Sequence, residues 1–142
     1  AGYKMAKLKA TLLDGKYHDV DSSEMAFKMA ARLSYKHAMA KCNPIMLEPI
    51  MNVEVRVPDE FTGTIMGDFN KRRGSIMGMD LVDGYQIITA QAPMAEMMRY
   101  PIDLRAMTQG MGSYTMSFER YDPVPSNIAD KIIAAAKSEA EE

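Results

Sequence analysis

Residues 47–121 contain six segments whose order constrains the fold more than any other feature of the chain. Alternating apolar and polar residues predict four strands, at 47–58, 75–82, 85–93 and 113–121. Two helices are predicted between them, at 58–73 and 93–108. Strand, helix, strand, strand, helix, strand is the order of a ferredoxin-like βαββαβ domain. We therefore predict an α+β fold in which a four-stranded antiparallel sheet carries both helices on one face.

Local signals mark the buried face and the turns of this domain. Valines alternate with polar residues over 53–57 and predict the buried face of the first strand. Asp83-Gly84 is a two-residue hairpin signal. Gly74 follows the first helix and predicts a left-handed cap. Pro101 either kinks the second helix or marks a late start.

The residues before this domain predict a strand and a helix that belong to a second α/β domain. The stretch 5–13 alternates in places and predicts the strand. Asp21 and Glu24 have the spacing of a capping box, which predicts a helix that runs to about Lys41. Because the chain begins directly at a strand, we expect residues 1–44 to be a remnant of a larger domain.

The remnant helix has an apolar row of Met25, Met29 and Leu33. We expect this row to pack against the domain at 45–125 or against a second copy of the chain. The second arrangement predicts a homo-oligomer through the truncated domain surface. A helical tail is predicted over 126–142.

Composition and motif searches exclude several classes of function. Cys42 is the only cysteine, so an internal disulfide is impossible, and a reducing, cytoplasmic setting fits. His18 and His37 do not have metal-ligand spacing. The chain contains no GxxxxGK[ST] phosphate loop and no apolar run of the ~20 residues that a membrane span needs. We predict no catalytic, metal or cofactor site on these residues.

Two short polar stretches remain as candidate RNA contacts, although the formal net charge of −2 gives no global attraction to nucleic acid. Arg105 and Gln109 lie four residues apart beside a glycine turn, which would present a guanidinium, an amide and exposed backbone N–H groups to RNA. The other stretch ends the first helix, where cations also favour the helix dipole. It consists of Asn70, Lys71, Arg72 and Arg73.

Four blocks of the sequence closely resemble the carboxy-terminal part of bacterial translation elongation factor G. They are residues 17–30, 46–58, 67–80 and 103–125, and they cover nearly the whole chain in the family order. The resemblance implies the end of domain IV at 1–44 and the ferredoxin-like domain V at 45–125. It also implies a parent protein that is a ribosome-dependent GTPase, promotes translocation of tRNA and mRNA, and assists ribosome recycling.

The same resemblance implies the partners of the chain. Residues 105–109 would approach the sarcin-ricin loop of the large-subunit rRNA, near the factor-binding site, and other domains of the parent protein would be neighbours. No membrane contact is implied. GTP and Mg would bind the N-terminal part of the parent protein, with no catalysis on this fragment. Ala106 and Met111 depart from the family pattern, in which a serine and a basic residue are usual.

Other interpretations of a ferredoxin-like domain stay open at this point. Such sheets also form regulatory modules that dimerise and bind small molecules, so a pocket with convergent polar groups is the alternative prediction. A generic RNA-recognition domain is a weaker interpretation, because the sheet does not carry the expected aromatic pattern. The parent protein is either the main translocase or a divergent paralogue.

Overall fold

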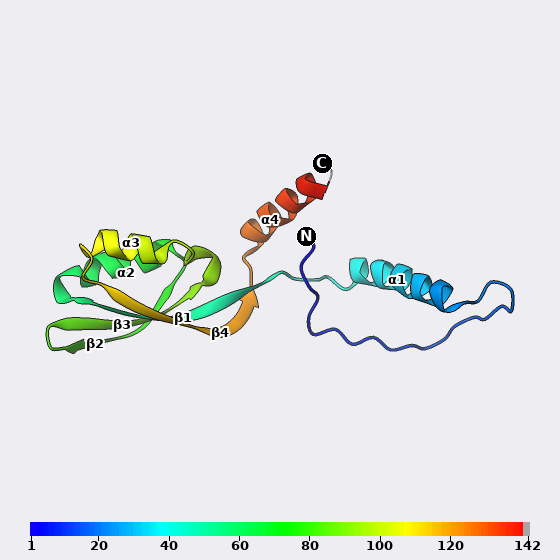
Figure 1. Cartoon of the computed structure of the whole chain (residues 1–142), viewed down its shortest axis with the longest axis horizontal. Coiled ribbons are helices and arrows are strands. Elements are labelled where there is room, and N and C mark those ends of the chain that lie inside the picture. The colour runs from blue at the N-terminus through cyan, green and yellow to red at the C-terminus, as the bar shows by residue number, and fades with distance from the viewer. Residues whose placement is uncertain (141–142) are drawn as a thin grey trace. The chain divides into compact units, whose positions relative to one another are not determined.

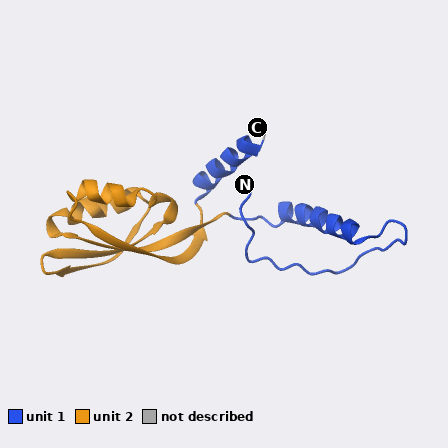
Figure 2. Cartoon of the chain, viewed as in Figure 1, with its two compact units in different colours: residues 1–45, 125–142 blue, residues 46–124 orange. Residues whose placement is uncertain are grey.

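The computed structural model describes residues 1–140 (Figure 1). It divides the chain into two compact units (Figure 2). Unit 2 comprises residues 46–124, and unit 1 comprises residues 1–45 together with the chain from residue 125 onward. The candidate functional residues all lie in unit 2.

Unit 2 is built on one antiparallel sheet with the strand order β2-β3-β1-β4. Helices α2 and α3 lie on one face of this sheet (Figure 1). This arrangement confirms the predicted α+β, ferredoxin-like fold. The elements are β1 (Leu47–Pro58), α2 (Thr62–Lys71), β2 (Ser75–Val82), β3 (Tyr85–Pro93), α3 (Tyr100–Met107) and β4 (Ser113–Pro123).

The core of unit 2 forms where the alternating face of β1 meets the two helices. Val53, Val55 and Val57 are fully buried, as their spacing predicts, because alternate residues of a strand point to the same face. Phe69 of α2 and Tyr100 of α3 are fully buried in the same cluster. Their ring centroids are 5.6 Å apart, so one aromatic contact joins the two helices.

Both helices of unit 2 begin later than predicted, and each follows a short 3₁₀ turn. Asp59–Phe61 precedes α2, and Met94–Glu96 precedes α3. Pro101 lies in the first turn of α3, where its missing N–H has no helical acceptor to lose. Pro101 was predicted either to kink the helix or to mark a late start, and the structure shows a late start.

The hairpin between β2 and β3 has the predicted tight turn. Asp83 and Gly84 have φ values of 50° and 77°, so both are left-handed, as a type I′ turn requires. The N–H of Asp59 donates to the Gly84 carbonyl at 3.2 Å and links the end of β1 to this turn.

The end of α2 corrects one prediction, because the left-handed residue is Arg73 (φ 56°) and not Gly74. The Gly74 N–H donates to the Phe69 carbonyl at 2.8 Å, which is the long bond of a Schellman motif. Glycine is needed at position 74 because a Cβ atom has no room there. A Cβ on Gly74 would lie 2.9 Å from Phe69 Cδ1 and 3.2 Å from the Gln91 carbonyl oxygen.

Helix α3 ends in the same way. Gln109 is left-handed (φ 52°), and the N–H of Gly110 donates to the Arg105 carbonyl at 2.9 Å. Both helices therefore place a residue other than glycine at the position where the Schellman motif prefers glycine. A left-handed conformation costs such a residue roughly 1–2 kcal/mol.

Unit 1 contains helix α1 (Glu24–Lys41) and helix α4 (Ser126–Ala140). The Oγ of Ser23 accepts a hydrogen bond from the Ala26 N–H at 3.1 Å, so Ser23 caps α1 and the prediction of Asp21 is wrong. The predicted strand at 5–13 is wrong as well, since residues 1–23 contain no strand. Strand backbone groups need a neighbouring strand, and all four strands of the described chain pair within unit 2.

The apolar row of α1 is exposed. Met25, Met29 and Leu33 are 75 %, 57 % and 60 % exposed, respectively. Their packing against another surface, including a second copy of the chain, stays a prediction. Neither α1 nor any other helix within residues 1–140 combines the length and the apolar character needed to cross a membrane.

Candidate nucleic-acid interface

Arg72, predicted to contact RNA, is turned into unit 2. Its guanidinium donates to Asp68 at 2.7 Å, to Asp103 at 2.6 Å and to the Glu96 carbonyl at 2.7 Å, and the side chain is 12 % exposed. It also lies 5.0 Å from the centroid of the Tyr100 ring. Burial opposes the charge, but the hydrogen bonds to the two carboxylates outweigh it and raise the pKa of Arg72. The guanidinium therefore joins α2 to α3.

Arg73 is held by a second set of internal partners. It donates to both carboxylate oxygens of Glu48, at 2.8 Å and 2.9 Å, and to Glu96 at 3.2 Å. The hydrogen bonds to Glu48 raise the pKa of Arg73, against the opposing effect of burial. This paired geometry ties the end of α2 to β1 and offsets the left-handed backbone of Arg73.

These contacts argue against a phosphate-binding corner at the end of α2. A guanidinium that already meets two or three acceptors inside the protein has little capacity left for phosphate. Asn70 and Lys71, the other two residues of the predicted stretch, are exposed. We therefore leave Arg72 and Arg73 out of the interface proposed below.

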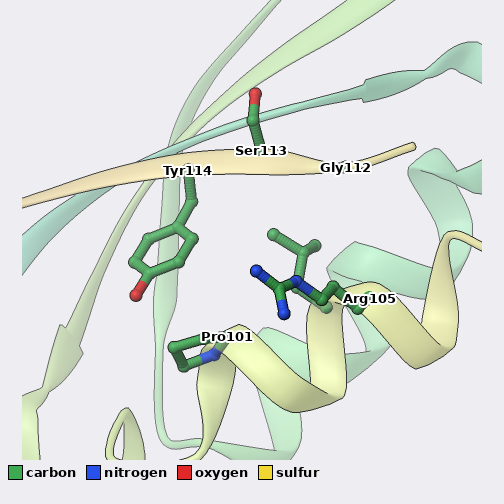
Figure 3. A pocket seen from close by; sticks show the side chains of 6 residues that line it. Pro101, Arg105, Gly112, Ser113 and Tyr114 are labelled. Carbon is green, nitrogen blue, oxygen red and sulfur yellow. The ribbon is translucent and has the colours of Figure 1, made fainter. Parts of the chain in front are cut away.

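In contrast to Arg72 and Arg73, Arg105 and Gln109 face solvent. Both side chains are exposed, and within residues 1–140 neither makes a side-chain hydrogen bond or an ion pair. Arg105 borders a cavity of about 240 Å³ between α3 and β4. Figure 3 shows its guanidinium extending from α3 toward β4, where the ring of Tyr114 points into the same space.

The turn after α3 offers fewer backbone donors than predicted. Of the five N–H groups from Thr108 to Gly112, four donate within the turn, to oxygens of Leu104, Arg105 and Thr108. Only the N–H of Gln109 has no acceptor in the described part of the chain. The prediction of several exposed N–H groups is therefore wrong, and the turn presents mainly the side chains of Arg105 and Gln109.

The charge of unit 2 makes any RNA contact local. Residues 46–124 contain seven Lys or Arg against eleven Asp or Glu, a formal net charge of −4. Two of the seven cations, Arg72 and Arg73, are neutralised internally. A broad electrostatic attraction to phosphate is thus excluded for unit 2, and a contact must depend on specific groups such as Arg105.

Comparison with known proteins gives the family. Residues 45–132 match the family model described as elongation factor G C-terminus, and residues 1–43 match the model described as elongation factor G, domain IV. The chain belongs to the elongation factor G family. Both matches confirm the resemblance that the four sequence blocks indicate, and the ferredoxin-like unit 2 lies within the C-terminus match.

One solved crystal structure is similar to this chain over most of its length. A protein from Thermus thermophilus matches this chain with a TM-score of 0.76 and 39 % sequence identity. The match covers 91 % of this chain and 19 % of that chain. The present chain is therefore similar to about a fifth of the length of that protein.

Sequence reasoning missed the contribution of β4 to the site. The sequence predicts only that Tyr114 lies in the strand at 113–121, yet its ring lines the cavity beside Arg105. Tyr114 also packs edge-on against Tyr100, with ring centroids 5.2 Å apart. The strand order puts β4 at the edge of the sheet beside β1, and the contact between Tyr114 and Tyr100 joins it to α3. These neighbours are far apart along the chain, so sequence motifs do not reveal them. No group of three or more metal-binding side chains occurs in residues 1–140.

Proposed function

We propose that this chain is the ribosome-contacting part of a cytoplasmic translational GTPase that promotes translocation of tRNA and mRNA and assists ribosome recycling. Arg105 and Gln109 contact large-subunit rRNA at the sarcin-ricin loop, and unit 2 orients the rest of the factor. GTP and Mg bind other domains of the parent protein, so the role of this fragment is mechanical. Its family membership and the exposed pair at the end of α3 support this proposal.

One contrast within the fold carries the assignment of the contact residues. Arg73 and Gln109 occupy the same left-handed position at the ends of α2 and α3. The strain at Arg73 is offset by its ion pair with Glu48. Gln109 has no such partner among the described residues. Because the side chain of Gln109 has no internal partner, its strained position favours an external contact for the amide.

Arg105→Ala is the direct test of the proposed function. We expect affinity for a synthetic RNA hairpin that carries the sarcin-ricin loop to fall about tenfold, because a hydrogen bond from a charged group is lost. The slope of log affinity against log salt should become shallower by about one, since one phosphate contact disappears. Fluorescence anisotropy with the complete 142-residue chain over a salt series measures both quantities.

Arg99→Ala is the matched control for Arg105→Ala. Arg99 is also exposed and occupies the N-cap position of α3 without a side-chain capping hydrogen bond, so the formal charge changes equally at the other end of the helix. We expect its effect on RNA affinity to be small. Equal losses for the two variants, or no loss for Arg105→Ala, contradict the proposed contact.

Gln109→Gly separates stability from binding. Glycine removes the left-handed strain, so the free energy of unfolding should rise by about 1 kcal/mol. The amide contact is lost at the same time, and RNA affinity should fall about fivefold. Thermal unfolding and anisotropy on the same samples measure the two effects.

Arg73→Gly provides the comparison for Gln109→Gly. It relieves the same backbone strain but leaves the Glu48 carboxylate, which is 11 % exposed, without its cation. Arg73→Gly should therefore lose stability. A Gln109→Gly variant that loses stability, or binds RNA like the unchanged chain, argues against the role of Gln109.

The structure does not favour the alternative of a small-molecule regulatory module. The cavity beside Arg105 has a volume of about 240 Å³. Pockets that enclose small ligands ordinarily have roughly 300–1,000 Å³. This cavity therefore gives no support to a ligand-binding function.

A further inference from the structure

We infer that Thr108 is a positioning residue for the RNA contact: its buried hydroxyl fixes the turn that carries Gln109 and follows Arg105. This inference rests on the function proposed above. Thr108 does not touch RNA itself, because its side chain is fully buried. It acts by fixing the backbone that carries Arg105 and Gln109.

The Thr108 hydroxyl both donates and accepts a hydrogen bond. Oγ1 donates to the Leu104 carbonyl at 2.7 Å and accepts from the Gly112 N–H at 2.9 Å. One oxygen therefore joins the last turn of α3 to the residue before β4. The Thr108 carbonyl also accepts from the Met111 N–H at 2.9 Å. Residues 109–111 are thus closed into a loop by the side chain and carbonyl of Thr108, together with the bond from the Gly110 N–H to the Arg105 carbonyl.

The enclosed loop is the strained part of the site. Gln109 and Gly110 are both left-handed, with φ values of 52° and 81°. Glycine adopts this conformation freely, but glutamine keeps it only when the surrounding structure fixes it. The two bonds of the Thr108 hydroxyl supply that restraint at the two ends of the loop. Without them, the direction of the Gln109 side chain relative to Arg105 is free to change.

Gly112 shows how closely the loop is built around this hydroxyl. Its φ is not in the left-handed region, so its conformation does not call for glycine. A Cβ at this position would lie 2.8 Å from Thr108 Oγ1 and 3.0 Å from Leu104 Cδ1. Glycine is required here because any side chain would push the backbone away from Thr108. The close approach of Gly112 to Thr108 therefore brings the Gly112 N–H within hydrogen-bond distance of the Thr108 hydroxyl.

Thr108→Val is the appropriate test, because valine is also β-branched and puts a methyl group, which neither donates nor accepts a hydrogen bond, in place of the hydroxyl. We expect Thr108→Val to bind the sarcin-ricin hairpin about tenfold more weakly in the complete chain. Thr108→Ser keeps the hydroxyl, and its affinity should stay within about twofold of the unchanged chain.

A combined variant distinguishes positioning from a general structural role. If Thr108 acts through Arg105 and Gln109, the triple change Arg105→Ala, Gln109→Ala and Thr108→Val should bind no more weakly than the change of Arg105 and Gln109 alone. A general loss of structure would instead weaken both backgrounds by the same factor. That second result overturns the inference.

The outcomes separate this inference from the proposed function. Loss of affinity in Arg105→Ala with none in Thr108→Val overturns the positioning role and leaves the function standing. No loss in Arg105→Ala overturns the function, and this inference with it. Amide hydrogen exchange in the unchanged chain adds a test that needs no variant. The Gly112 N–H should be protected relative to that of Gln109, and equal, rapid exchange of both overturns the inference.

Discussion

Replacing Arg72 with alanine is expected to lower the free energy of unfolding of unit 2 by about 3 kcal/mol. The variant leaves Asp68, whose side chain is 14 % exposed, without its cation. It also removes the donors to Asp103 of α3 and to the carbonyl of Glu96 in the 3₁₀ turn that precedes α3. Urea denaturation, followed through the amide signals of β1, measures the change. In a domain of this size the melting temperature should fall by on the order of 15 °C.

Lys71→Ala is the matched control for the Arg72 variant. Lys71 precedes Arg72 in the basic triplet, is exposed, and makes no ion pair with any residue from 1 to 140. Its removal should change the stability by less than about 0.5 kcal/mol. Similar effects of the two substitutions would mean that Arg72 is as solvated as Lys71 and that the internal network does not form in solution.

Gly74→Ala is expected to destabilise unit 2 by about 2 kcal/mol. The new Cβ would meet the Phe69 ring at 2.9 Å and two backbone oxygens, of Phe69 and Gln91, at 3.1 Å and 3.2 Å. A side chain can rotate away from such a contact, whereas the backbone oxygens belong to the helix end and to β3. The substitution therefore has to separate the end of α2 from the sheet. Chemical denaturation of the complete chain gives the size of the loss.

Gly78→Ala in the adjoining strand β2 controls for the general cost of replacing glycine. A Cβ at Gly78 meets nothing within 4 Å. Alanine there should be neutral or stabilise by about 0.5 kcal/mol, because it reduces the freedom of the unfolded chain. If Gly74→Ala proves as harmless as Gly78→Ala, close approach is not the reason for glycine at the end of α2.

The fold of unit 2 was predictable because its signals are local and agree with one another. The alternating valines of β1, the Asp83-Gly84 turn and the order of the six elements each follow from a few neighbouring residues. The strand at 5–13 was not predictable in the same way. Alternation shows that a segment is able to pair, but the presence of a partner depends on the rest of the fold.

The candidate site was predicted less well, for a physical reason. A run of three cations looks the same in the sequence whether it faces solvent or carboxylates. The partners of Arg72 and Arg73 that turn them inward include Glu48, Glu96 and Asp103, which are 23–31 residues away along the chain. Arg105 and Gln109 were selected from their four-residue spacing beside a glycine turn, which is a local signal, and the structure places Arg105 in α3 and Gln109 in the turn beyond its end.

The position of β1 in the middle of the sheet has a consequence for how the chain folds during its own synthesis. β1 is the first strand of unit 2 to be made, yet its two neighbours, β3 and β4, are the last two. Val55, for example, pairs with Ile88 on one side and with Tyr114 on the other. A nascent chain must therefore keep an apolar strand uncovered until most of the domain has been translated, which favours slow folding and early chaperone capture.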